Sequence, residues 1–164
     1  MKSGLKFIVE RIKILFEFLV SLRIMNVAFV AVMLLLSSCE TAPPKINFGK
    51  DLCDLCKMTI MDKKFGALAM NNKGKTVKFD SGECMVNYLV IDGKIDVEKF
   101  LIINYTVPEE LIDATNAYFL QGGEVRSPMG GQLAAFGSKE EAMKFQKELN
   151  ANLLTWNQVK ELDF

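Results

Sequence analysis

The chain has 164 residues, with 20 basic and 20 acidic side chains and no histidine. Without histidine, the imidazole that usually completes zinc, Cu(II) and non-haem iron sites is missing, and no serine has an imidazole base to activate it. The balanced charge leaves no basic footprint for nucleic acid. Composition therefore argues against nucleic-acid binding and histidine-dependent hydrolysis.

Residues 1–38 are predicted to be a secretory signal. A basic leader is followed by an apolar run over residues 24–36, which is shorter than the ~20 residues that a membrane-spanning helix needs. The run ends in Leu36-Ser-Ser-Cys39, which resembles a bacterial lipobox, where the signal is cut and the cysteine is acylated. We expect a palmitate-type lipid anchor on Cys39, at the exported side (periplasm or outer membrane), with a simple spanning helix as the alternative.

Residues 39–50 are predicted to be the lipidated cysteine and a short tether, because Pro43-Pro44 favours extended polyproline geometry. The leader carries five basic and two acidic residues, a net charge of +3, so the rest of the neutral chain carries −3. Residues 51–164 are enough for one domain with its own core. We therefore expect a mildly acidic, exported domain.

The domain begins with the motif Cys53-Asp-Leu-Cys56-Lys-Met58, two thiols and a thioether close together. Soft sulfur ligands select Cu(I) over Mg, Ca or Mn. With Cys39 reserved for lipid, Cys53, Cys56 and Cys84 are an odd number that disulfides cannot pair fully. We hypothesise a Cu(I) site here. The alternatives are a thioredoxin-like redox pair and a disulfide that clips a small loop.

The first half of the domain is predicted to contain two strands, a helix and a third strand. The strands cover residues 65–71, 75–79 and 100–105. Asp80-Ser81 can cap the helix, whose apolar residues recur at helical spacing. Cys84, near the helix start, is either a further thiolate ligand or a small buried hydrophobic residue.

The second half repeats this order of elements. Strands are predicted over residues 114–120, 132–136 and 152–156, with a terminal helical turn over 159–164. Ser138 and Glu141 form a capping box at the start of a helix. Three apolar residues make its inner stripe: Ala142, Phe145 and Leu149.

The sequence before the two helices is alike, Phe79-Asp-Ser81 and Phe136-Gly-Ser138. We therefore predict an α+β fold of two tandem β-β-α-β modules, over about residues 58–105 and 113–157, packed as one small domain behind the signal helix. Chance similarity of short elements is the alternative.

Met129 lies in the turn signature Arg-Ser-Pro-Met-Gly-Gly of residues 126–131. Pro128 fixes the backbone and the glycines allow sharp conformations, so this thioether is a poor core candidate. We hypothesise that Met129 supplies a Cu(I) ligand from the second module. Three other methionines are expected to fill apolar gaps: Met61, Met70 and Met143.

Taken together, these motifs resemble the NosL family, the lipoprotein copper accessory proteins of nitrous oxide reductase. The likeness covers the lipobox, the Cys-x-x-Cys-x-Met motif, Phe79-Asp80, Tyr118-Phe119, Ser127-Pro-Met129-Gly and Ala135-Phe136. The resemblance implies two β-β-α-β modules and Cu(I) binding. The ligand candidates it implies are Cys53, Cys56, Met58 and Met129, and Cys84 stays a possible additional ligand on the ground of its place near the helix start. Lys57 departs from the pattern, which often has glycine there.

The resemblance also implies partners. These are a copper-receiving reductase and a membrane ABC-type transport complex, with attachment to the membrane through the lipid. We expect a metallochaperone that passes Cu(I) on by ligand exchange, not an enzyme. The alternative is a thiol–disulfide protein that uses Cys53 and Cys56 to keep a copper-site thiol reduced.

Overall fold

The computed structural model describes residues 21–23, 43–92 and 96–164. Residues 21–23 are helical, while the rest of the predicted signal and the lipobox lie outside the described residues. Among the helices that are described, none has the length and hydrophobicity that a bilayer crossing requires. The chain divides into two units, Met1–Ala42 and Pro43–Phe164, and the second is the folded domain.

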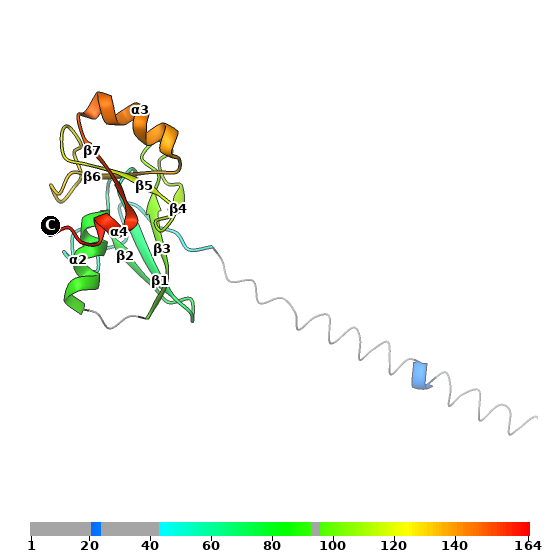
Figure 1. Cartoon of the computed structure of the whole chain (residues 1–164). Helices are drawn as coiled ribbons and strands as arrows, with labels where there is room; N and C mark the ends of the chain where they lie inside the picture. The colour runs from blue at the N-terminus through cyan, green and yellow to red at the C-terminus, as the bar shows by residue number, and fades with distance from the viewer. Residues whose placement is uncertain (1–20, 24–42, 93–95) are drawn as a thin grey trace, which may run out of the picture. The chain divides into compact units, whose positions relative to one another are not determined.

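The first module contains three antiparallel strands and a helix (Figure 1). Its elements are β1 (Ala67–Asn71), β2 (Thr76–Phe79), α2 (Gly82–Asp92) and β3 (Val97–Ile103). The turn between β1 and β2 forms because the Asn71 side chain accepts hydrogen bonds from the N–H groups of Lys73 and Lys75, at 3.0 and 2.9 Å. The short strand β4 (Leu111–Asp113) joins this sheet, whose order is β2-β1-β3-β4.

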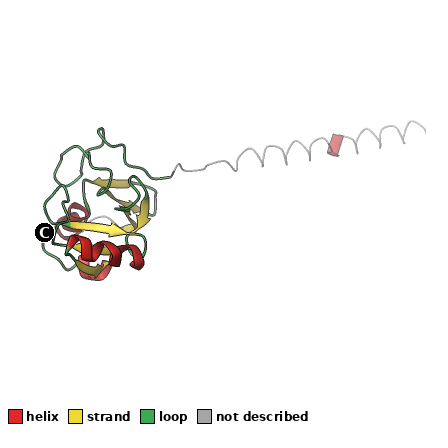
Figure 2. Ribbon diagram, turned by 90° about the horizontal axis from the view of Figure 1, so that it is seen from above, coloured by secondary structure: helices red, strands yellow, loops and turns green. Residues whose placement is uncertain are grey.

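The second module has the same order of elements in a smaller sheet. Its elements are β5 (Tyr118–Gln121), β6 (Leu133–Phe136), α3 (Lys139–Leu149) and β7 (Asn152–Thr155), followed by α4 (Trp156–Val159). The strand order is β6-β5-β7, and α3 packs against all three strands (Figure 2). The Ser138 hydroxyl accepts a hydrogen bond from the Glu141 N–H at 3.3 Å, as the capping box predicts. The predicted α+β fold of two β-β-α-β modules is confirmed.

Several boundaries differ from the predicted ones, and β3 starts and ends earlier than the strand expected over residues 100–105. The strand expected from residue 114 begins at Tyr118, because the Asp113 carboxylate accepts the Thr115 N–H at 2.8 Å and turns the chain. The terminal helix begins at Trp156 instead of residue 159. Residues 46–50, assigned above to the tether, pack on the domain: Ile46 is buried in the core, and the Gly49 N–H donates to the Ile60 carbonyl at 2.8 Å.

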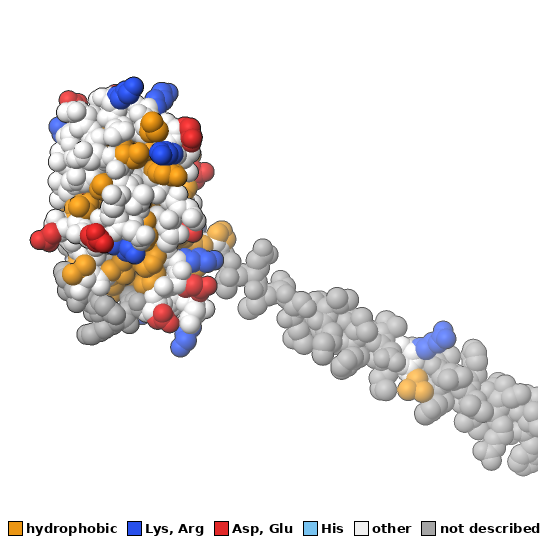
Figure 3. Space-filling view, in the orientation of Figure 1, with side chains coloured by type: hydrophobic (Ala, Val, Ile, Leu, Met, Phe, Trp, Pro, Cys, Tyr) orange, Lys and Arg blue, Asp and Glu red, His pale blue; other side chains and the backbone are white. Residues whose placement is uncertain are grey.

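The two modules share one main hydrophobic core. Phe79 and Met85 of the first module and Phe119 and Trp156 of the second belong to the same buried cluster. A second, smaller cluster lies beneath α3 and includes Phe136. The Tyr105 N–H donates to the Ala135 carbonyl at 2.8 Å, which joins the end of the first module to β6. On the face drawn in Figure 3, acidic and basic side chains are scattered over the domain.

Candidate metal centre

Three thiols converge in the first module. The sulfur atoms of Cys53, Cys56 and Cys84 all lie within 4.8 Å of one another, and all three cysteines are free. A metal–sulfur bond of about 2.3 Å lets one ion join sulfurs up to about 4.6 Å apart. A single soft ion therefore fits between these thiols after shifts of a few tenths of an ångström. Cys53 and Cys84 are buried, whereas Cys56 is half-buried and gives the cluster access to solvent.

Local hydrogen bonds shape the segment that carries the first two thiols. The Cys53 N–H donates to the Met58 carbonyl at 2.8 Å, and the Lys57 N–H donates to the Cys53 carbonyl at 3.0 Å. Asp54 docks this turn on β2: its N–H donates to the Lys78 carbonyl at 2.8 Å, and its carboxylate accepts the Lys78 N–H at 2.8 Å. Because β2 leads directly into α2, this docking brings the motif to the helix that carries Cys84.

Cys84 lies in the first turn of α2. The Ser81 hydroxyl oxygen accepts the Cys84 N–H at 3.4 Å, which is the capping contact expected for a serine before a helix. The sequence allowed two roles for Cys84, a thiolate ligand or a small buried hydrophobic residue. In the structure Cys84 is both buried and a member of the thiol cluster.

Hydrogen bonds divide the three thiols into one acidic and two weakly acidic groups. The Cys84 thiol donates to Cys53, and this bond, with the N–H groups of Asp80, Cys56 and Leu55, lowers the pKa of Cys53 to about 5 despite its burial. Donation to Cys53, together with burial, raises the pKa of Cys84. Burial, and then the neighbouring Cys53 thiolate, raise the pKa of Cys56. At neutral pH the cluster therefore holds one thiolate and two thiols.

Two buried carboxyl groups lie in the segment that leads to Cys84. Asp80 and Glu83 are 4% and 1% exposed, and within the described residues neither forms an ion pair. Burial raises the pKa of Asp80, and the negative charge of Cys53 raises it further. An environment with a buried thiolate, carboxyl groups and no paired cation attracts a positive ion.

The two predicted thioether ligands lie on separate loops. The Met58 N–H donates to the Cys56 sulfur, but its side chain is 48% exposed. Met129 lies in a turn closed by the Gly130 N–H and the Ser127 carbonyl at 3.1 Å, and its side chain is 41% exposed. The structure thus gathers the three thiols and leaves both thioethers at the surface.

Sequence reasoning missed some polar residues of the site and misplaced two methionines. Asp80 was assigned only a capping role and Glu83 none, although a polar run between Phe79 and a cysteine was a signal of a buried polar cluster. Met61 and Met143 do not fill apolar gaps, because Met61 lies in a loop and Met143 points away from the inner stripe of α3. Both are exposed.

Lys57 has a left-handed backbone conformation, with φ of +64°. A Cβ in this region is strained, whereas glycine adopts it readily. This explains why glycine suits the position between the second cysteine and the methionine. The Lys57 ammonium donates to the Asp54 carbonyl and offsets part of the strain.

Lys57→Gly is expected to raise the free energy of unfolding by roughly 0.5 to 1 kcal/mol, because relief of the Cβ strain exceeds the added freedom of the unfolded chain. Denaturant unfolding of the reduced protein measures the change. Lys57→Ala is the matched control, since it removes the ammonium contact and keeps the Cβ. Equal stability of the two variants would contradict the strain argument.

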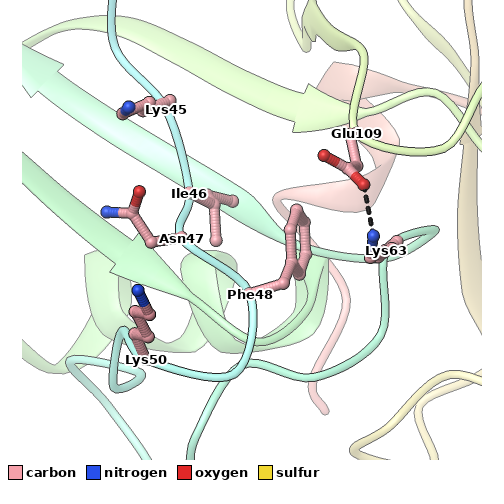
Figure 4. Close-up of a pocket in the computed structure, with 7 residues that line it drawn as sticks. All are labelled: Lys45, Ile46, Asn47, Phe48, Lys50, Lys63 and Glu109. Carbon is pink, nitrogen blue, oxygen red and sulfur yellow. Dashed lines mark hydrogen bonds and ion pairs between the residues drawn. The ribbon is translucent and has the colours of Figure 1, made fainter.

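A surface hollow of about 380 Å³ lies where the chain enters the domain (Figure 4). Lys63 and Glu109 form an ion pair at 2.5 Å on its rim. Its other lining residues are Lys45, Ile46, Asn47, Phe48 and Lys50. None of these lining residues carries sulfur, so the hollow is not part of the thiol cluster.

The fold and the thiol cluster define a class: a small α+β protein of two β-β-α-β modules with a soft, sulfur-rich metal centre. The sequence model of the NosL family matches residues 46–163, and the chain belongs to this family. The resemblance inferred from the motifs is thereby confirmed.

A solved structure supports the fold. The crystal structure of the copper chaperone NosL from Shewanella denitrificans is similar, with a TM-score of 0.58 and 22% sequence identity over 71% of this chain and 96% of that chain. At this identity the likeness shows a shared fold. No curated protein matched the chain.

Proposed function

We propose that this protein is a membrane-anchored metallochaperone for Cu(I). The observation that carries the proposal is the cluster of three thiols within 4.8 Å of one another, one of them ionised at neutral pH. Thiolates are the ligands that soft Cu(I) prefers. Family membership and the name of the copper chaperone from Shewanella denitrificans support the same conclusion.

The ligand set is drawn from Cys53, Cys56, Met58 and Met129, with Cys84 as a further thiol. Cys53 is already a thiolate and receives the ion without first losing a proton. Cys56 and the exposed thioethers lie where a ligand from a partner can join before an old one leaves. The protein carries and releases its cargo, and we assign it no catalytic residue.

The recipient is nitrous oxide reductase or a related copper enzyme, served together with a membrane ABC-type transport complex. The lipobox at Cys39 and the proline-containing tether support an anchor on the exported side of a membrane. An anchored chaperone searches for its partners within a thin layer at the membrane surface. Transfer of Cu(I) from the loaded protein to the copper-free reductase tests this assignment.

The burial of Cys53 weighs against thiol–disulfide exchange as the main role. The thiol with the lowered pKa is inaccessible, and the accessible thiol, Cys56, has a raised pKa. An efficient exchange thiol combines exposure with a pKa near the ambient pH. The two properties are split between two residues here, an arrangement that suits metal binding better.

Titration of the reduced protein with Cu(I) against a competing chelator tests the proposal. We expect one ion per chain, and an affinity that rises about tenfold per pH unit between pH 6 and 8. Over this range Cys53 has lost its proton and Cys56 has not, so binding to both releases one proton. Below about pH 5, where Cys53 is also protonated, the dependence steepens to two protons.

The proton count also distinguishes ligand sets. Release of two protons per ion between pH 6 and 8 would identify Cys84 as a third thiolate ligand, because its pKa is also raised. Cys56→Ser is the control and should remove the pH dependence attributed to Cys56. Affinity that does not change with pH, or no uptake of Cu(I), would contradict the proposal.

A further inference from the structure

Glu83 is a buried carboxylate that links the two modules. It lies in the first turn of α2, next to Cys84, and is 1% exposed. Its Oε1 atom accepts a hydrogen bond from the Ser127 hydroxyl and another from the Leu133 N–H at 3.1 Å. Ser127 and Leu133 flank the turn that carries Met129. One oxygen atom therefore holds both sides of the turn against the helix that carries a site thiol.

The turn is fitted closely to this carboxylate. The Ser127 hydroxyl oxygen also accepts the Gln132 N–H at 2.9 Å, which closes the segment from residue 127 to 132. A Cβ added at Gly131 would lie 2.5 Å from the Cγ atom of Glu83, so only glycine allows this approach. The glycine pair after Met129 therefore serves the contact with Glu83 as well as the turn itself.

The second carboxylate oxygen shows that this arrangement has an energetic cost. Oε2 of Glu83 is buried and has no hydrogen-bond partner among the described residues. A buried polar atom without a partner destabilises the fold, and an apolar side chain of similar size would avoid that loss. Packing alone does not account for a glutamate here, whereas the need to hold one loop in one position does.

We propose that Glu83 is a positioning residue for Met129, and that its carboxylate fixes the loop of the second module against the first turn of the helix that carries Cys84. This inference rests on the proposed Cu(I) function. Met129 itself is 41% exposed, so its position depends on the turn that carries it. Anchoring its turn through Glu83 lowers the entropy lost when the thioether binds an ion.

The test measures the loop and the metal separately. In the metal-free protein, Glu83→Ala should speed hydrogen exchange at the amides of Gln132 and Leu133 at least tenfold. The substitution removes the oxygen that accepts the Leu133 N–H, and it releases the Ser127 hydroxyl that accepts the Gln132 N–H. With Cu(I), Glu83→Ala and the milder Ser127→Ala should each lower affinity about tenfold, as Met129→Leu should. Glu83→Gln keeps an acceptor oxygen and should retain most of the affinity.

A double-mutant cycle identifies the route of the effect. If Glu83 acts through Met129, the double variant Glu83→Ala/Met129→Leu loses no more affinity than Met129→Leu alone. Glu124→Ala, an exposed carboxylate in the same loop, is the matched control and should change neither measurement.

The outcomes separate this inference from the proposed function. Additive losses in the double variant would show that Glu83 acts on the thiols and would overturn the role toward Met129. Unchanged amide exchange in Glu83→Ala would overturn the anchoring itself, whatever copper does. Failure of the unsubstituted protein to take up Cu(I) would instead overturn the proposed function. The hydrogen-exchange measurement on the metal-free protein would still test whether Glu83 anchors the loop.

Discussion

Cys53→Ser is expected to lower the affinity for Cu(I) by about 1000-fold, a loss of roughly 4 kcal/mol of binding free energy. Of the three thiols in the cluster, Cys53 alone is ionised at neutral pH, and the hydrogen bonds that ionise it converge on its sulfur. Serine keeps nearly the same shape but offers a hard, protonated oxygen that a soft ion does not bind well. Competition titration at pH 7 measures the change.

Substitutions of the other two cysteines are expected to lower the affinity for Cu(I) by different amounts. Cys56→Ser should cost almost as much, since it removes the second thiolate of the bound state. Cys84→Ser retains a hydroxyl that can donate to the Cys53 sulfur, so a loss below tenfold would identify Cys84 as a donor, and a larger loss as a ligand. Met143→Leu removes an exposed sulfur from α3 and is the control. Unchanged affinity in Cys53→Ser would refute the assigned centre.

Phe119→Ala is expected to destabilise the whole domain by about 3–5 kcal/mol. Phe119 is completely buried on β5, its ring lies 5.9 Å from that of Trp156, and it belongs to the core shared by both modules. Domains of this size have only about 5–15 kcal/mol of total stability. The variant should therefore unfold at much lower denaturant concentration, in one transition.

Two probes can follow this transition. The chain has a single tryptophan, Trp156, whose ring lies 5.3 Å from that of Phe100, so fluorescence reports the shared core, while circular dichroism reports the secondary structure of both modules. Coincident transitions are expected because the modules share a core. Val90→Ala, on the exposed side of α2, is the control and should change stability by less than about 0.5 kcal/mol. Separate transitions would mean that the modules fold independently.

The sequence predicted the elements well where the signal was local. The N-cap contact of Ser138 and the turn between the strands predicted over residues 65–71 and 75–79 are made by neighbouring residues, and both form as expected. The strand expected from residue 114 starts late because a single side chain, Asp113, turns the chain there. Because apolar residues lie on both sides of that turn, the hydrophobicity pattern alone did not indicate it.

The site was only half predictable. Cys53 and Cys56 are only three positions apart, but Cys84 reaches them because Asp54 pairs with Lys78, 24 residues away. Glu83 was overlooked because its partner, Ser127, lies 44 residues further along the chain. Contacts over such separations depend on how the sheets pack, and no spacing rule within one segment contains that information.

The unequal burial of the two motif thiols gives the handover a direction. A docking protein can touch Cys56 but not Cys53, so we expect the exchange of bonds to start at the rim and the innermost bond to break last. The cargo then stays attached at every moment of its passage, and the interior need not open to release it.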